Sequence, residues 1–187
     1  MIAESPYLYP SFKVLYSEAM RILIATPLYP PDTALTAQYV KELAGRLSKD
    51  HVVTILLYGY LPEEVRGVKT ISIDKRKPVL LRVFLFLKSL LKTLPQQDLL
   101  LTVNGRSVEI PVFLAVHTRK IPLIFLPYDT QSPLSFFGRR LQEKSKQNIS
   151  FKDLSLTRPE ILPFQEYPAD AFRAYEHDWE SHLATLI

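Results

Sequence analysis

Five short apolar runs between residues 21 and 126 alternate with longer stretches in which apolar residues recur at helical spacing. The apolar runs occupy residues 21–26, 51–58, 68–73, 98–103 and 121–126, and the helical stretches occupy 36–49, 79–94 and 107–120. Continuous runs such as RILIAT are typical of parallel strands that helices cover on both faces. Strands that alternate with helices in this way predict right-handed βαβ crossovers. We therefore expect an α/β fold with a Rossmann-like open, mainly parallel sheet and helices on both faces.

The chain divides into three predicted segments. Residues 1–19 lack the pattern of a secretory signal peptide and are expected to be an amino-terminal arm. Residues 20–137 are expected to form the Rossmann-like domain, and either Met1 or Met20 is the natural start. Residues 138–187 are expected to form a polar linker followed, from Pro168, by a helix that docks on the domain.

Composition excludes several classes of function. The absence of cysteine excludes disulfide scaffolds, thiol nucleophiles and zinc fingers. The five glycines form neither G-x-G-x-x-G nor G-K-[ST], which argues against P-loop kinases and ordinary dinucleotide dehydrogenases. The four histidines lack metal-ligand spacing, so we predict no metal site. The net charge of +4 comes without a nucleic-acid reader motif, so no nucleic acid is expected as a partner, and a cytoplasmic location is expected.

Candidate ligand-binding residues follow from the predicted sheet. In doubly wound sheets, ligands bind beyond the carboxyl ends of the strands, which points here to the loops after the first, fourth and fifth strands. The candidates for substrate binding are Tyr29, Thr33, Thr36, Asn104, Arg106, Asp129 and Thr130. Asp129 is also the candidate catalytic carboxylate, although aspartate in a P-Y-D-T sequence is a common turn former.

The loop before the first predicted helix has two interpretations. Backbone N–H groups near Thr33 and Thr36 could receive a phosphate with the help of the helix dipole. Alternatively, Asp32 or Thr33 caps the helix and binds no ligand. Both interpretations use the same side chains, so the sequence leaves them open.

Residues 20–59, MRILIATPLYPPDTALTAQYVKELAGRLSKDHVVTILLYG, resemble the opening of glycosyltransferases of the GT-B fold, especially family 4. In that family, an M-[RK]-I-L-[IV] strand precedes a P-x-[YF]-[PY]-P loop, a Y-V-x-x-L-A-x-x-L helix and an H-x-V-T-[VI] strand. The later segments DLLLTVNG, SVEIPVFLA and KIPLIF are also similar to the amino-terminal domain of the family. The resemblance covers roughly residues 20–130 and implies the acceptor-side half of a two-domain enzyme.

The chain departs from the family at three points. It has Asp32-Thr33-Ala34-Leu35 where the family usually has a glycine pair, and Leu126-Pro127-Tyr128-Asp129 where many members have a histidine. The donor-binding domain with its Glu-x7-Glu signature is absent, so a nucleotide-sugar donor would require a carboxyl-terminal glycosyltransferase domain or subunit as partner, and we expect no cofactor on this chain. The resemblance thus implies acceptor binding in a sugar-transfer system, by a fragment or a split-enzyme subunit. The alternative is a catalytically inactive binding or scaffold module that retained the fold.

The predicted helix at 79–94, VLLRVFLFLKSLLKTL, is basic and strongly apolar. It is too short to span a bilayer and is interrupted by Arg82, Lys88 and Lys92. Such a helix either packs into the core against the sheet or lies on anionic lipid. Many family 4 members use lipid-linked acceptors, so the resemblance is compatible with peripheral membrane contact through residues 79–94.

Overall fold

The computed structural model describes residues 19–127, 134–146 and 169–187. The predicted arm falls outside this range except for residue 19, and so do the candidates Asp129 and Thr130.

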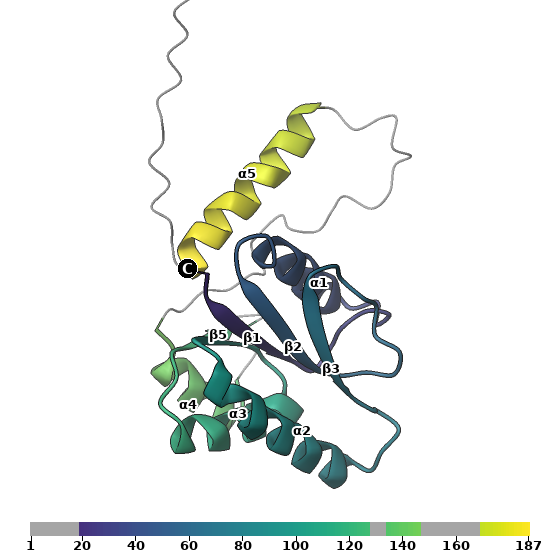
Figure 1. Cartoon of the computed structure of the whole chain (residues 1–187), viewed down its shortest axis with the longest axis vertical. Coiled ribbons are helices and arrows are strands. Elements are labelled where there is room, and N and C mark those ends of the chain that lie inside the picture. Colours follow the sequence, from purple (N-terminus) through teal and green to yellow (C-terminus); the bar gives the residue numbers. More distant parts are fainter. Residues whose placement is uncertain (1–18, 128–133, 147–168) are drawn as a thin grey trace, which may run out of the picture.

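The centre of the molecule is a parallel five-stranded sheet (Figure 1). Its strands are β1 (Arg21–Thr26), β2 (Val52–Tyr58), β3 (Val68–Ile73), β4 (Leu99–Val103) and β5 (Leu123–Leu126). Their order across the sheet is β3-β2-β1-β4-β5, and Ile24 of β1 lies beside Ile55 of β2 and Leu101 of β4. The predicted Rossmann-like α/β fold is therefore confirmed. The order reverses between β1 and β4, which is where sheets of this kind ordinarily bind ligands.

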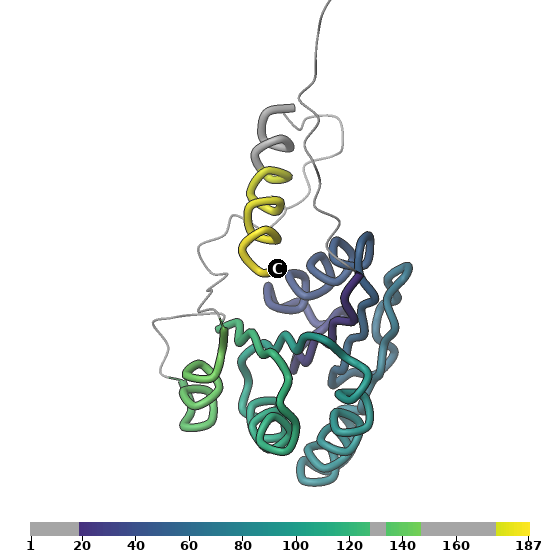
Figure 2. The backbone as a smooth tube through the Cα atoms, turned by 60° about the vertical axis from the view of Figure 1, so that its left-hand side comes forward, coloured from purple at the N-terminus to yellow at the C-terminus, as the bar shows by residue number. Residues whose placement is uncertain are grey.

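Helices cover both faces of the sheet (Figures 1 and 2). They are α1 (Leu35–Leu47), α2 (Val79–Thr93), α3 (Arg106–Thr118), α4 (Phe136–Lys144) and α5 (Ala169–Leu186), with a short 3-10 turn at Leu94–Gln96. Helices α1 and α5 lie on one face, and α2, α3 and α4 lie on the other. Within the described residues, no helix has the length and apolar character needed to cross a bilayer.

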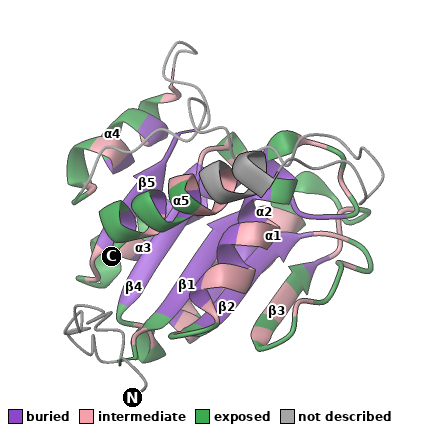
Figure 3. Ribbon diagram, turned by 90° about the horizontal axis from the view of Figure 1, so that it is seen from above, coloured by how far each residue is buried: buried purple, intermediate pink, exposed green. Residues whose placement is uncertain are grey.

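The core has two layers because side chains alternate between the two faces of each strand. Ile22 and Ile24 of β1 pack with α1 and α5, whereas Leu23 and Ala25 pack with α2 and α3. This double burial explains the continuous apolar runs of the inner strands. Figure 3 shows the inner strands buried and the edge strand β3 partly exposed.

Residues 136–144 form a helix, although residues from 138 onward were expected to begin a polar linker. They form α4, which begins after Ser135, whose hydroxyl accepts a hydrogen bond from the Gly138 N–H at 3.0 Å. Leu141 is fully buried in the second core layer. One short apolar face within a strongly polar sequence is sufficient to hold this helix on α3.

The carboxyl-terminal helix α5 docks beside α1 through aromatic and charged contacts. The Trp179 ring is fully buried and stacks on Tyr39 with ring centroids 5.7 Å apart. The Arg46 guanidinium donates two hydrogen bonds to the Glu176 carboxylate, at 2.7 and 2.9 Å. His182 Nε2 lies 2.7 Å from the Tyr39 hydroxyl, and both side chains are buried. The helix expected from the apolar spacing after Pro168 is thus an integral part of the core.

Candidate functional site

The carboxyl edge of the sheet is closed at the point where the strand order reverses. Gly105, two residues after the end of β4, has φ +155° and lies against Pro27, directly after β1. A Cβ at position 105 would come within 2.7 Å of the Pro27 Cγ. The loops after β1 and β4 therefore touch, and a glycine is required for this close approach.

The Gly105→Ala substitution is expected to lower the free energy of unfolding by about 2 kcal/mol, through backbone strain and overpacking against Pro27. Urea unfolding followed by circular dichroism measures this loss. Gly45→Ala is the matched control, because a Cβ at position 45 of α1 would lie at an ordinary 3.6 Å from its nearest neighbour, Val65 Cγ1. The control should leave stability equal or slightly higher, since alanine favours a helix. Equal stability of Gly105→Ala and the unsubstituted chain would contradict the prediction.

A small pocket opens next to this contact, at the carboxyl ends of β1, β2 and β3. It is lined by Pro27, Tyr58, Lys75, Val79, Arg82, Val83 and Ser107. Its volume is about 100 Å³, whereas pockets that enclose a drug-sized ligand have about 300 to 1,000 Å³. The pocket can therefore hold a group of a few heavy atoms but cannot enclose a sugar nucleotide.

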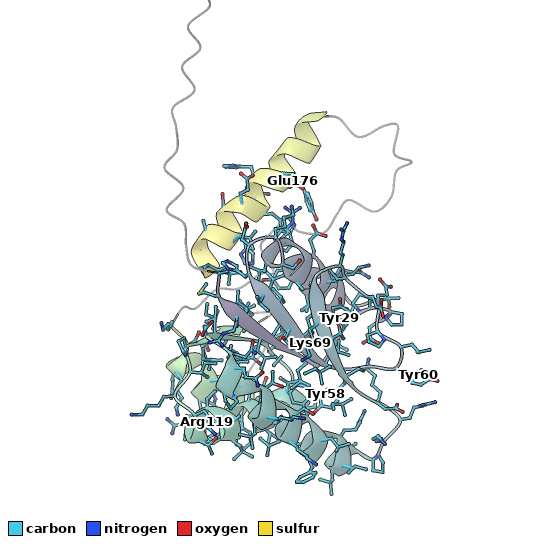
Figure 4. The ribbon with its side chains drawn as sticks, viewed as in Figure 1. Tyr29, Tyr58, Tyr60, Lys69, Arg119 and Glu176 are labelled. Atoms are coloured by element: carbon cyan, nitrogen blue, oxygen red, sulfur yellow. The ribbon has the colours of Figure 1, made fainter. Side chains whose placement is uncertain are left out.

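Tyr58, at the end of β2 (Figure 4), is one of the residues that line the pocket, and it contacts both α2 and α3. Its hydroxyl donates a hydrogen bond to the Ser107 carbonyl at 2.9 Å, and its ring stacks on Phe86 at 4.7 Å. Burial raises the pKa of the Tyr58 hydroxyl, and the nearby Arg82 charge only partly opposes this effect. The phenol is thus neutral at physiological pH and acts as an anchor for the start of α3.

Two basic side chains line the pocket. The Arg82 guanidinium donates a hydrogen bond to the Lys75 carbonyl at 2.9 Å, and the Lys75 ammonium pairs with the Asp32 carboxylate. Arg82 thus bonds to the backbone of residue 75, whereas the Asp32 carboxylate balances the charge of Lys75. Both cations are only partly exposed, so a bound anion would interact with them more strongly than with fully solvated charges. The planar guanidinium of arginine also matches the geometry of phosphate and carboxylate groups.

The predicted binding residues that follow β1 differ in how far their side chains are exposed. Tyr29 is 2% exposed and belongs to the core, where burial, with a smaller effect of Glu63, raises the pKa of its phenol to about 12. Its hydroxyl has no hydrogen-bond partner among the described residues. Thr36 is buried in the first turn of α1, and Thr33 is exposed.

Neither Asp32 nor Thr33 caps α1, so the capping interpretation of this loop is wrong. The residue before α1 is Ala34, which has no side-chain cap. Asp32 instead accepts a hydrogen bond from the Tyr29 N–H at 3.3 Å and pairs with Lys75. Asp32 is thus drawn away from the helix by a cation supplied from the loop after β3.

The loop after β4 holds the other described candidates. The Asn104 N–H donates to the Leu126 carbonyl at 3.2 Å, which joins β4 to β5, and Arg106 is exposed at the start of α3. None of the described candidates from the sequence lines the pocket, so their roles in ligand binding stay predictions. Sequence reasoning missed Lys75 and Arg82, although applying the strand-end rule to β3 would have pointed to the cluster Lys75-Arg76-Lys77.

Glu109 is a buried carboxylate that sequence reasoning also missed. It is 3% exposed, accepts a hydrogen bond from the Gly105 N–H at 2.9 Å and accepts another from the Ser135 hydroxyl. An acidic residue in the first turn of a helix is a usable signal, because it complements the helix dipole. Here it ties the loop after β4 to the start of α4. No group of three or more metal-ligating side chains occurs among the residues that the structure describes.

Comparisons with known proteins assign this chain to no family. No protein-family model matches the chain, and no curated protein matches it. Among solved structures, the C-terminal domain of the coenzyme A biosynthesis bifunctional protein CoaBC is 11% identical with a TM-score of 0.40, covering 61% of this chain and 66% of that one. Anabaena Alr3699/HepE, solved in complex with UDP, is 15% identical with a TM-score of 0.45, covering 67% of this chain and 36% of that one. The C-terminal domain of PF1911 hydrogenase from Pyrococcus furiosus is 16% identical with a TM-score of 0.38, covering 58% and 92%. At these values, none of the three assigns a function.

Proposed function

We propose that this chain is a glycosyltransferase-like amino-terminal domain that binds the acceptor of a sugar transfer at the carboxyl edge of its sheet. The proposal is carried by the cationic pocket at the ends of β1, β2 and β3, where Lys75 and Arg82 converge. It is supported by the resemblance of residues 20–59, whose expected strand, loop, helix and strand occur in that order. In this proposal a second domain or subunit holds the nucleotide-sugar donor.

The size of the pocket explains why this domain would be incomplete alone. A volume of about 100 Å³ corresponds to roughly three water molecules of liquid. Such a pocket can seat one anionic group of an acceptor while the rest of the acceptor lies outside it. Sugar transfer requires donor and acceptor to be held together in reactive geometry, so a second surface would have to cover the pocket.

The charges of the pocket favour an acceptor that carries a phosphate or a carboxylate. The Arg82 guanidinium offers paired N–H donors and has no ion-pair partner among the described residues, whereas the Lys75 ammonium is paired with Asp32. A neutral acceptor group can accept hydrogen bonds from these donors, but an anionic group forms the stronger charge-assisted ones. An anionic acceptor group is therefore the chemistry that this pocket recognises best.

Geranyl phosphate should bind the ¹⁵N-labelled chain and shift the amide resonances of Tyr58, Lys75 and Ser107, whereas the neutral alcohol geraniol should not. Arg82→Gln should weaken the binding about tenfold, which corresponds to the loss of one charge-assisted hydrogen bond. Lys69→Gln, at an exposed position of β3 (Figure 4), is the matched control and should bind normally. Equal binding of geraniol, or undiminished binding by Arg82→Gln, would refute the proposed anion site.

A catalytically inactive binding module is the second candidate, and the contact between Pro27 and Gly105 favours it. That contact fills the position between β1 and β4 where a ligand ordinarily approaches such a sheet. Mixing the chain with a separate domain that carries the Glu-x7-Glu signature distinguishes the two candidates. Sugar transfer only in the mixture supports the split enzyme, whereas anion binding without transfer in any mixture supports the inactive module.

A further inference from the structure

Helix α2 carries large apolar side chains on its outer surface as well as on the surface that packs under the sheet. Phe86 and Leu90 are fully buried in the core. On the outer surface, Leu80 is 86% exposed and Phe84 is 62% exposed. Core packing, one of the two interpretations of the sequence 79–94, therefore accounts for only one side of the helix.

The exposed side chains form a continuous ridge along α2. Residues four apart lie one above the other on a helix, so Leu80, Phe84, Lys88 and Lys92 share one line, and all four are exposed. The amino-terminal half of this ridge is apolar and the carboxyl-terminal half is basic. Val79 and Leu81, beside it, are 60% and 43% exposed.

The loop between β2 and β3 carries two further exposed apolar side chains, Tyr60 and Leu61. The Tyr60 ring lies at the edge of the molecule in Figure 4. The Arg76 guanidinium stacks over this ring, with its Cζ 3.8 Å from the ring centroid. Arg76 is two residues before Pro78, which precedes α2. Leu61, next in the chain, is 76% exposed and has φ +53°, a conformation that is an outlier for a bulky residue. We call Tyr60, Leu61 and the exposed side chains of Val79, Leu80, Leu81 and Phe84 the apolar rim.

The charges along α2 have one sign. Near Tyr60 and Leu61 they are mixed, since Glu63 and Glu64 follow in the chain and Asp74 pairs with Arg76. Residues 75–97 contain six cationic side chains and no acidic one. Within the described part of the chain, no ion pair involves Lys77, Lys88 or Lys92. The α2 part of the rim is thus an apolar surface flanked by lysines that have no ion-pair partner among the described residues.

We propose that the apolar rim binds the surface of an anionic lipid bilayer. Apolar side chains of a surface helix enter the boundary between headgroups and acyl chains, while lysines at its flanks reach lipid phosphates. A second copy of the chain fits this surface less well, because a two-fold interface would place the same cations face to face. α2 lies along the outside of the molecule (Figure 1), on the sheet face opposite α1 and α5.

Membrane binding through the rim would also orient the pocket. Val79 belongs both to the rim and to the lining of the pocket, so the mouth with Lys75 and Arg82 would lie at the level of the lipid headgroups. This orientation, which rests on the proposed function, favours an acceptor whose anionic group is attached to a lipid. Bilayer binding itself requires neither an acceptor nor a donor domain.

Flotation of the full chain with vesicles tests the proposal. The chain should float with vesicles of equal parts phosphatidylcholine and phosphatidylglycerol, and should not float with phosphatidylcholine alone or in high salt. Leu80→Ser with Phe84→Ser, and separately Lys88→Glu with Lys92→Glu, should each lower the partition coefficient about tenfold or more. Because all four positions are exposed, these variants should keep the circular dichroism spectrum of the unsubstituted chain.

The matched controls lie elsewhere on the surface. Val52→Ser removes an apolar side chain that is 59% exposed at the start of β2, and Lys49→Glu with Lys69→Glu reverses two exposed charges. Both should bind vesicles normally. Failure of the unsubstituted chain to float with anionic vesicles, or equal losses in rim and control variants, would overturn the proposal. So would a dimer in solution that Leu80→Ser with Phe84→Ser dissociates while vesicle binding is absent.

Different variants test the proposals of acceptor binding and lipid binding independently of each other. Arg82→Gln should lose binding of geranyl phosphate while keeping most of the vesicle binding, because Arg82 faces the pocket. The Leu80→Ser with Phe84→Ser variant should lose vesicle binding while keeping the resonance shifts caused by geranyl phosphate. If the unsubstituted chain binds only geranyl phosphate or only vesicles, the proposal for the missing activity is wrong.

Discussion

Trp179→Ala is expected to lower the free energy of unfolding by about 4 kcal/mol and to release α5 from the domain. The Trp179 ring is fully buried, stacks on Tyr39 at 5.7 Å and lies 5.0 Å from the Arg46 guanidinium. Removing it leaves a cavity between α5 and α1 and also removes the surface on which Arg46 packs. Leu186, the Tyr39–His182 hydrogen bond and the Arg46–Glu176 pair remain, but Trp179 is the one fully buried aromatic side chain among those of α5 that the structure describes.

Two measurements together test this expectation. Urea unfolding followed by circular dichroism gives the change in stability, and hydrogen exchange shows whether the amides of residues 175–187 lose protection before the rest of the chain. His177→Ala, at an exposed position of the same helix, is the matched control and should change stability by less than about 0.5 kcal/mol. Unchanged exchange of the α5 amides in Trp179→Ala would show that α5 is held by other contacts.

Acidification is expected to destabilise the same contact through His182. This side chain is 4% exposed, and burial lowers its pKa to about 4 from an ordinary value of 6.5. The neutral ring can accept a hydrogen bond from the Tyr39 hydroxyl, whose own pKa burial raises further above its ordinary value. The folded state therefore resists protonation of His182, whereas the unfolded state does not.

The direction of the pH effect follows from this difference in proton binding. Below pH 6.5 the unfolded chain binds a proton that the folded chain excludes, so the stability present above pH 6.5 is lost as the pH falls toward 4. The full loss is about 3 kcal/mol, at 1.36 kcal/mol for each pH unit between the two values. Glu176 contributes a further loss of stability at lower pH, because its hydrogen bond with Arg46 holds the pKa of its carboxyl below the ordinary 4.5.

Fluorescence of Trp179 gives a direct signal for this transition, because it is the one tryptophan in the sequence and its ring centroid lies 5.7 Å from that of His182. Unfolding free energies between pH 7 and pH 4 should fall steeply for the unsubstituted chain and for His177→Gln. They should fall much less for His182→Gln, which has no titrating ring. Parallel pH profiles for all three proteins would exclude His182 as the source of the effect.

The sequence was sufficient to predict the sheet and most of the helices because these elements depend on local periodicity. The run RILIAT at 21–26 is apolar at consecutive positions, and β1 is buried on both faces. It was insufficient for α4, a helix of nine residues in which Leu141 is the one apolar buried side chain, because so short and strongly charged a stretch also fits a surface linker.

The pocket was harder to predict than the fold. Tyr58, Lys75, Arg82 and Ser107 lie on β2, on the loop after β3, on α2 and on α3, respectively, and no motif joins them. Conversely, the predicted candidate Tyr29 follows a strand as the rule requires, yet its side chain points into the core. Position at a strand end selects the loop but leaves the direction of each side chain open.

The sequence by itself determined the alternation of strands and helices, the absence of cysteine chemistry and glycine-rich phosphate loops, and the surplus of positive charge along residues 75–97. Tertiary structure decided which segments contact one another and which side chains are buried. It placed Trp179 on Tyr39, closed the loops after β1 and β4 through Gly105, and turned Leu80 and Phe84 outward while burying Phe86 and Leu90. The physical reason is that periodicity is a property of neighbouring residues, whereas burial and pairing depend on which distant surfaces the sheet brings together.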